Sequence, residues 1–342
     1  MSGFLEIDGS EGEGGGQILR TSLSLSLVRG KAVRVTKIRA GRDKPGLRAQ
    51  HLAAVNAAAT IGEAVVTGAE LGSTEVSFSP KAIVPADYRI DVGTAGSTSL
   101  VLQTLLPALL LAKVPSTLVL DGGTHNPMAP PFEFLSRAFL PLVNRMGAKV
   151  EAKLDRAGFY PGGGGKIRVT ISPPKKWVRL DLLERGEIVK RRAISFVSEL
   201  PTHIAERELK VVKLGLGWKQ DEMRAGDLGT TRGPGNVMVL EIESEHVTEV
   251  ICGIGAKGIR AERVAEECVE QAKRYVESHV PVGEHLADQL MLPMALAGGG
   301  SFRTLPLSAH ATTQIALLGK FGIEVTAANR DDGSVQVAVG SI

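Results

Sequence analysis

Three helices of this chain are predicted to end in the same way, and this repeat constrains the fold more than any other feature. An apolar residue and a glycine precede a short strand-like run at Ile61–Gly62, Met146–Gly147 and Phe321–Gly322. Glycine suits a helix end because it adopts positive φ without steric cost. A proline, typical of a helix start, lies 16 or 17 residues before each glycine, at Pro45, Pro130 and Pro306. The repeat predicts three copies of one β-α-β-α-β-β unit.

The spacing of the three glycines also predicts an insertion. Gly62 and Gly147 are 85 residues apart, whereas Gly147 and Gly322 are 175 residues apart. The longer interval has room for one more domain, which we place at residues 184–280 because that stretch has strand and helix patterns of its own. The predicted fold class is α/β (α+β): a large domain of three units, residues 1–183 plus 281–342, interrupted by a smaller inserted α/β domain.

Composition and hydropathy favour a globular protein without a leader or a membrane span. The chain has 342 residues, 43% of them hydrophobic, which suffices for a full core. Its start lacks the basic end and the apolar run of a signal peptide. The most apolar window, residues 100–119, is interrupted by Gln103, Lys113 and two prolines. Its two cysteines, Cys252 and Cys268, have no CxxC spacing and indicate free thiols, so we expect a cytoplasmic protein.

Positive charge is concentrated in one short segment. Residues 31–50 carry seven Lys or Arg and a single Asp, a net +6, whereas the whole chain carries +3. Within it, residues 39–51 also hold two glycines and a proline, which keep the backbone bent. A concentrated basic loop attracts polyanions, so the segment predicts phosphate binding. A solvated charged turn is the alternative interpretation.

A glycine-rich turn, residues 11–16, leads into an apolar helix and is a second candidate anion site. Glycines let backbone amides approach an anion at a helix N-terminus. The turn matches neither the P-loop nor the dinucleotide-binding pattern. Glu13 is a candidate Mg²⁺ ligand between phosphates, with an ordinary turn glutamate as the alternative. Arg20 lies three residues after Gln17, on the same helix face, and can reach the same anion.

His310 is the best candidate nucleophile among seven histidines. It follows Pro306 by four residues, and Ser308 is a plausible N-cap of the helix that it begins. The positive end of a helix dipole lowers a histidine pKa and stabilises a phosphate attached to the ring. A histidine packed for structural reasons is the alternative. No histidine pair has the spacing of a zinc site.

Two further glycine clusters are ambiguous. Residues 298–300 follow a helix and are interpreted as its end. Residues 162–165, in GFYPGGGG, are compatible with a hairpin turn or with a close backbone approach to a ligand.

Taken together, these segments resemble the RNA 3'-terminal phosphate cyclase family from end to end. The motifs that carry the resemblance are GSEGEGGGQILR, IRAGRDKPGL with QHL, VLQTLLPALL, GGTHNPMAPP, GFYPGGGG, ERE, GPGN, GEHLADQLMLPMALAGGG and the late histidine. The family's fold, three units resembling the C-terminal domain of a bacterial translation initiation factor plus one inserted domain, agrees with the predicted repeat.

The resemblance implies an ATP-dependent ligase that acts in RNA processing. A histidine attacks the α-phosphorus of ATP to form a histidine–AMP and pyrophosphate. AMP then moves to an RNA 3'-phosphate, giving RNA-3'-pp-5'-A, and the neighbouring 2'-hydroxyl displaces it to leave a 2',3'-cyclic phosphate. The expected partners are ATP, an Mg or Mn divalent cation and RNA with a 3'-terminal phosphate, without a membrane or an obligate protein partner.

The resemblance also assigns roles to individual residues. His310 corresponds to the nucleophile and Glu13 to the metal-binding glutamate. The positions expected to bind triphosphate or RNA phosphate are Arg20, Arg39, Arg42, Gln50 and His51. Those expected to bind ATP are Gln103, Pro130, Phe134, His285, Asp288 and Gln289, with Pro130 and Phe134 as walls for adenine. For these two walls, ordinary packing at a helix start is the alternative.

Two positions depart from the family pattern, and three other functions compete. Position 285 is histidine instead of tyrosine, which puts nucleotide selectivity in question, and Ala157 replaces a basic residue. The first competing function is a catalytically inactive cyclase-like scaffold in ribosome assembly, which the presence of His310 and Glu13 disfavours. Enolpyruvyl transfer is disfavoured because this chain has three units, not six. A non-catalytic nucleic-acid binder is disfavoured because no RNA-binding module is recognisable.

Overall fold

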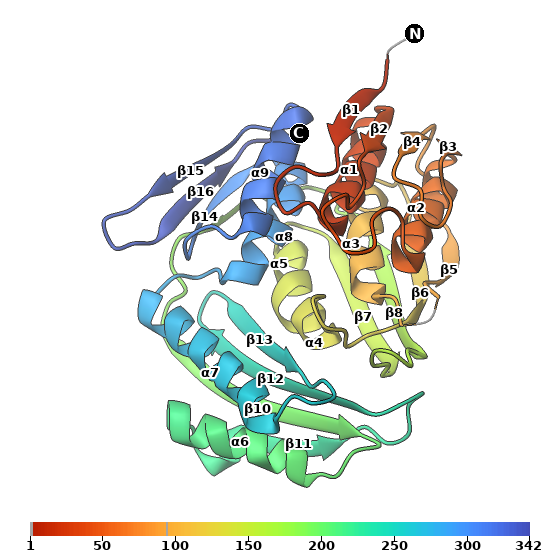
Figure 1. Ribbon diagram of the computed structural model, residues 1–342. Coiled ribbons are helices and arrows are strands. Elements are labelled where there is room, and N and C mark those ends of the chain that lie inside the picture. The colour runs from red at the N-terminus through yellow and green to blue at the C-terminus, as the bar shows by residue number, and fades with distance from the viewer. Residues whose placement is uncertain (1–2, 94) are drawn as a thin grey trace.

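The computed structural model describes residues 3–93 and 95–342 (Figure 1). Its first four-stranded sheet has the strand order β1-β2-β4-β3, in which β1 and β2 are parallel and the other pairs antiparallel. The elements of this part are β1 (Leu5–Asp8), α1 (Gly16–Arg29), β2 (Val33–Thr36), α2 (Ala49–Gly62), β3 (Val65–Thr67) and β4 (Val76–Ser79).

The second sheet has the order β5-β6-β8-β7 with the same pattern of strand directions. Its elements are β5 (Asp87–Asp91), α3 (Thr98–Leu109), β6 (Ser116–Gly122), α4 (Phe132–Phe134), α5 (Leu140–Arg145), β7 (Lys149–Arg156) and β8 (Gly165–Ser172). A π-helical turn, Leu135–Phe139, joins α4 and α5 into one helix.

The third sheet has the order β9-β14-β16-β15, again with the first pair parallel and the rest antiparallel. Its elements are β9 (Leu180–Leu182), α8 (Glu284–Leu296), β14 (Gly300–Thr304), α9 (Ala309–Lys320), β15 (Val325–Asn329) and β16 (Val335–Val339). All three sheets therefore have the same strand order, and the elements of each follow the predicted succession β-α-β-α-β-β. The third sheet is built from segments on both sides of residues 183–283.

The helix ends agree with the predicted repeat at two positions and differ at the third. Gly147 and Gly322 follow their helices with φ of +105° and +78°. In α2, however, Gly62 is the last helical residue, and Glu63 adopts the positive φ of +42°. A side chain at Gly62 would collide with Leu27 of α1. Close helix packing, not the helix end, therefore requires that glycine.

Residues between β9 and α8 form a fourth sheet of a different kind, with the order β11-β10-β12-β13. Its elements are β10 (Ile188–Ser198), α6 (His203–Leu216), a 3₁₀ turn (Gln220–Glu222), β11 (Met223–Asp227), β12 (Gly235–Ser244), β13 (Thr248–Ile254) and α7 (Ala261–Ser278). Figure 1 shows this part, in green to cyan, at the bottom of the molecule beside α4. The domain boundaries at residues 183/184 and 280/281 stay a prediction.

The strand β12 contacts two hydrophobic cores. Met238, Leu240 and Ile242 belong to a small core with α6 and α7, whereas Val237 and Val239 belong to the large core. Because side chains alternate along a strand, one sheet face packs on its own helices and the other on the rest of the molecule.

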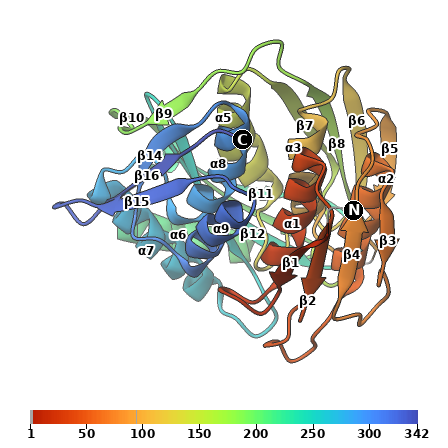
Figure 2. The ribbon, with the colours of Figure 1, turned by 90° about the horizontal axis from the view of Figure 1, so that it is seen from above.

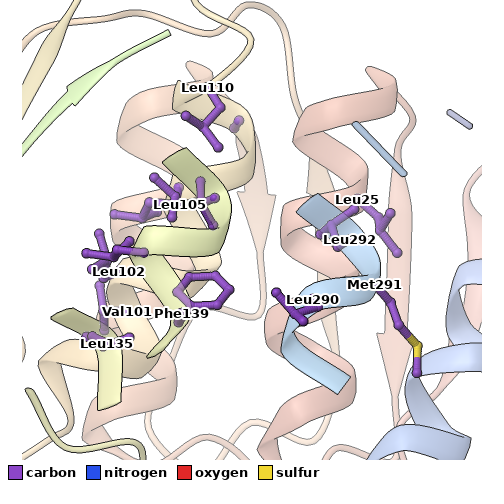
Figure 3. Close-up of a cluster of buried hydrophobic side chains, with 14 of the residues drawn as sticks. Leu25, Val101, Leu102, Leu105, Leu110, Leu135, Phe139, Leu290, Met291 and Leu292 are labelled. Carbon is purple, nitrogen blue, oxygen red and sulfur yellow. The ribbon is translucent and has the colours of Figure 1, made fainter. Parts of the chain in front are cut away.

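The large core holds the helices of the three units together. From above, α1, α3 and α8 lie near one another in the middle of the molecule, with the three sheets outside them (Figure 2). Figure 3 shows buried side chains at their centre, including Leu25, Leu105 and Leu290. Within the described residues, no helix is long and apolar enough to cross a membrane.

Candidate active site

His310 lies in the first turn of α9, as its sequence context predicts. The Ser308 hydroxyl accepts a hydrogen bond from the backbone N–H of Ala311 at 3.2 Å and caps the helix. His310 is exposed on its outer side, so a substrate can reach it.

One side chain from the start of the chain fixes the orientation of the His310 ring. The Gln17 amide nitrogen donates to the His310 backbone carbonyl at 3.2 Å and to the Asp288 carboxylate at 3.2 Å. A backbone carbonyl only accepts, so this side of the amide must be the NH₂ group. The Gln17 oxygen therefore faces His310 Nδ1, 2.8 Å away, and that nitrogen must donate. In a neutral ring, Nε2 then carries the free lone pair.

The charge state of His310 also suits a nucleophile. Burial of the ring's inner side lowers the pKa of His310, and the positive charges of Arg20 and Arg42 lower it further. The ring is therefore neutral at pH 7. The residues around the ring come from both ends of the chain, because α1 packs directly against α9.

Arg20 and His51 converge on Gly16 at the start of α1. A side chain at Gly16 would lie 2.6 Å from an Arg20 guanidinium nitrogen and would also collide with His51 Nε2. His51 Nδ1 accepts the Arg48 backbone N–H at 3.1 Å, and burial with nearby arginines lowers the pKa of His51 to about 3. The neutral ring therefore carries its proton on Nε2, which points to the same place as the Arg20 charge. Two donors beside a glycine suit a bound phosphate.

Glu13 is held by Arg42 within the glycine-rich turn. The Arg42 guanidinium pairs with Glu13 Oε1 and also donates to the Glu13 backbone carbonyl at 3.3 Å. Glu13 Oε2 accepts the Gly15 N–H at 2.9 Å. Among the described residues, no cluster of three or more His, Cys, Asp or Glu side chains could hold a metal ion. Glu13 thus offers one carboxylate, and further ligands for a cation would have to come from a phosphate-bearing substrate.

Arg39 and Gln50 support the neighbouring loops in this structure. Arg39 donates to the backbone carbonyls of Lys44 at 2.6 Å and Gly46 at 3.0 Å, which closes the basic loop. The Gln50 side-chain oxygen accepts the backbone N–H of Ser97 at 3.3 Å, at the N-cap of α3. Both side chains are half-buried, so their bonds to protein leave part of each group available.

Helix α8 brings three of the predicted residues to the site. Gln289 is hydrogen-bonded to Gln103 of α3 and donates to the His285 carbonyl at 2.7 Å. Asp288 faces Gln17, and burial raises the pKa of Asp288 to about 7 despite the Arg20 charge. The network Asp288–Gln17–His310 therefore joins α8, α1 and α9.

Comparison with known proteins identifies the family of this chain. The sequence model of the RNA 3'-terminal phosphate cyclase family matches residues 11–326. The chain belongs to the RNA 3'-terminal phosphate cyclase family. The chain is 52% identical over 318 residues to the RNA 3'-terminal phosphate cyclase of Koribacter versatilis, covering 93% of this chain and 90% of that protein. It is 48% identical over 335 residues to that of Ectopseudomonas mendocina, covering 98% and 97%.

One solved structure, EPSP synthase from Acinetobacter baumannii, aligns with 94% of this chain and 62% of its own at 14% identity. Its TM-score of 0.29 is too low to indicate a shared fold.

The cyclase family resemblance assigns Phe134 and Pro130 to the adenine pocket, but the structure buries Phe134 and leaves Pro130 partly exposed. Phe134 is only 3% exposed and packs in the large core, so in this structure its ring has no free face for adenine. The alternative of helix-start packing describes it better, because α4 begins at Phe132 and turns that side chain inward. Pro130 is partly exposed, and His285 is exposed at the start of α8. Their contacts with a nucleotide stay predictions.

Gln17 is the main site residue without an assigned role in the sequence analysis. Its position directly after the glycine-rich turn was visible, but its partners are 271 and 293 residues away along the chain. Thr313 is a second such residue, since its hydroxyl accepts the Glu13 backbone N–H at 2.9 Å. Both contacts depend on how α1 and α9 pack.

Proposed function

We propose that this protein converts an RNA 3'-phosphate end to a 2',3'-cyclic phosphate with ATP, through a covalent His310–AMP. Family membership supports the overall activity. The single observation that carries the covalent step is the Gln17–His310 hydrogen bond, which leaves Nε2 of an exposed, neutral histidine free to attack.

In the first step, His310 Nε2 forms a bond to the α-phosphorus of ATP, and the bond from that phosphorus to the bridging oxygen breaks to release pyrophosphate. The positive charge that develops on the ring is shared through Nδ1–H with the Gln17 oxygen. Arg20 and the His51 Nε2–H are the donors best placed to hold phosphate oxygens. Fixed donors stabilise developing negative charge because they need no reorganisation.

In the later steps, an oxygen of the RNA 3'-phosphate displaces His310 from the AMP phosphorus. The RNA 2'-hydroxyl then attacks the 3'-phosphorus, loses its proton, and AMP departs. Covalent activation is needed because a phosphate monoester has no good leaving group, whereas AMP is one. Asp288 has a pKa near 7, so it can exchange a proton at neutral pH within this network.

A divalent cation is part of the proposal. Glu13 would supply one carboxylate oxygen to it and would have to release Arg42 on that side. When bound between Glu13 and phosphates, an Mg or Mn ion would neutralise part of the triphosphate charge. A cytoplasmic location and the absence of an obligate protein partner remain expectations.

The test is AMP capture without RNA. Purified protein is incubated with α-labelled ATP and Mg²⁺ or Mn²⁺, then denatured, beside a His310→Ala variant. We expect acid-labile, alkali-stable label on the wild type and none on the variant. A second portion of labelled protein, kept native, is given RNA ending in a 3'-phosphate or a 3'-hydroxyl, and only the former should be converted. A folded wild type that captures no label with either metal would favour the inactive scaffold.

A further inference from the structure

The connection between β7 and β8, residues 157–164, carries an exposed aromatic side chain. Tyr160 is 65% exposed, whereas the other two tyrosines of the chain, Tyr88 and Tyr275, are partly or fully buried. A large aromatic ring left in water has no role in the core. An exposed ring is, however, the platform on which a nucleic-acid base stacks.

Two arginines contact the same connection. Arg156 donates from Nε to the Gly164 carbonyl, and the Arg232 side chain covers Gly164, whose missing side chain leaves room for it. Both arginines are exposed, and no carboxylate of the described residues is ion-paired with either guanidinium. The residue before Arg156 in the sequence is an acid, Asp155, but its carboxylate is paired with Arg168 at 3.1 Å. Two cations without an ion-pair partner among the described residues therefore lie against the connection that carries the exposed ring.

The two cations come from different parts of the fold. Arg156 ends β7, whereas Arg232 lies in the connection from β11 to β12, and Figure 1 shows the two connections beside each other. A side chain at Gly162 would lie within 2.9 Å of the Arg232 carbonyl carbon. The glycine cluster therefore permits a close backbone approach that gathers positive charge at one surface.

Buried backbone contacts join this connection to the candidate active site. The Thr124 and His125 backbone N–H groups donate to the Gly158 carbonyl at 2.9 and 3.1 Å. Two residues earlier, Gly123 pairs with Ser97, which bonds to Gln50. An unbroken run of contacts thus leads from a predicted phosphate-binding residue to the connection with Tyr160.

We propose that Tyr160, Arg156 and Arg232 bind the single-stranded RNA upstream of its 3'-terminal phosphate. The proposal rests on the proposed function, because it assumes an RNA substrate. Tyr160 stacks on one base, and the two guanidinium groups contact phosphates on either side of it. The surface reads no base edges, so binding there depends on RNA length and salt and not on sequence.

The test compares a 3'-phosphorylated RNA of about ten nucleotides with a 3'-phosphorylated dinucleotide, because only the longer one can reach this surface. Tyr160→Ala and Arg232→Ala should each weaken affinity for the longer RNA by about tenfold, as loss of one stacking or phosphate contact does. Affinity for the dinucleotide should be unchanged. Tyr160→Phe, which keeps the ring, should restore binding, and Arg330→Ala, an exposed arginine on the β15–β16 hairpin, is the control.

Two further measurements separate this proposal from the proposed function. AMP capture without RNA should be the same in the variants and the wild type. Affinity, measured without ATP, should fall for the longer RNA whether it ends in a phosphate or a hydroxyl. An equal loss on both RNA lengths, or no loss on the longer one, would overturn the proposal. A wild type that binds RNA through Tyr160 and captures no AMP would instead contradict only the proposed function.

Discussion

At the scale of single residues, a hydrogen bond to a glutamine selects the reactive nitrogen of His310. The Gln17 amide is oriented by two acceptors, so its oxygen can face only a donor on the ring. A histidine whose Nδ1 lacks this acceptor would divide its proton between both nitrogens. Part of the neutral population would then carry its proton on Nε2, the nitrogen that must attack ATP.

Gln17→Leu is expected to lower the rate of AMP capture at least about tenfold, equal to about 1.4 kcal/mol of transition-state stabilisation. Single-turnover rates with saturating labelled ATP measure this. The matched control is Gln314→Leu, because Gln314 accepts a hydrogen bond from Thr21 at 3.1 Å and joins the same two helices without touching His310. Equal losses in both variants would show that Gln17 acts only through helix packing.

The pH dependence of AMP capture follows from the charge on the same ring. Only neutral His310 attacks, and burial with Arg20 and Arg42 lowers its pKa below the ordinary value of about 6.5. The rate should therefore be level above neutral pH and fall only in more acidic buffer. Asp288 also titrates, near pH 7, so the profile is measured again in Asp288→Asn. A His310 inflection above pH 7 in that variant would contradict the assignment.

At the scale of elements, the position of α8 depends on a buried carboxylate from another sheet. Glu249 of β13 is 3% exposed and accepts the N–H of Gly283, the N-cap of α8, at 2.8 Å. A side chain at Gly283 would lie 2.6 Å from that carboxylate oxygen. The segment between β9 and α8 thus holds the start of the helix that carries His285, Asp288 and Gln289.

Burial raises the pKa of Glu249 to about 7 from its ordinary 4.5. The folded state binds this proton more tightly than the unfolded state does, so stability is greatest in acid and declines as pH rises from about 4.5 to 7, by up to about 3 kcal/mol. Glu249→Gln keeps an acceptor for Gly283 without the charge. Urea unfolding at pH 8 should therefore show a more stable variant, and the difference should vanish at pH 5. A variant that is less stable at pH 8 would contradict this account.

At the scale of the whole molecule, the two hydrophobic cores meet through the sheet of the inserted segment and through one tight backbone contact. Gly235, at the start of β12, lies directly against the Phe159 ring, which stacks on the buried His125 at 5.1 Å. Any side chain at position 235 would have to displace that ring. The contact joins the β7–β8 connection to the inserted segment.

Gly235→Ala should destabilise the protein by about 1–3 kcal/mol, the usual cost of overpacking a filled interior. Chemical denaturation measures the change in unfolding free energy. Gly319→Ala is the control, because Gly319 lies within α9 with open space where its side chain would extend, so alanine there should stabilise the helix by up to about 1 kcal/mol. Equal stability of the Gly235 variant and the wild type would show that Phe159 can move freely.

Local patterns in the sequence were enough to predict the repeat, the basic segment and His310 at the start of a helix. Such features depend on residues close together along the chain, where the 3.6-residue and 2-residue periods, caps and turns are set by backbone sterics. The tertiary structure alone decided that Gln17 orients His310, that Arg39 closes its own loop and that Phe134 is buried. These outcomes depend on which helix faces pack together, and that packing joins residues up to 293 positions apart, whose pairing no local period specifies.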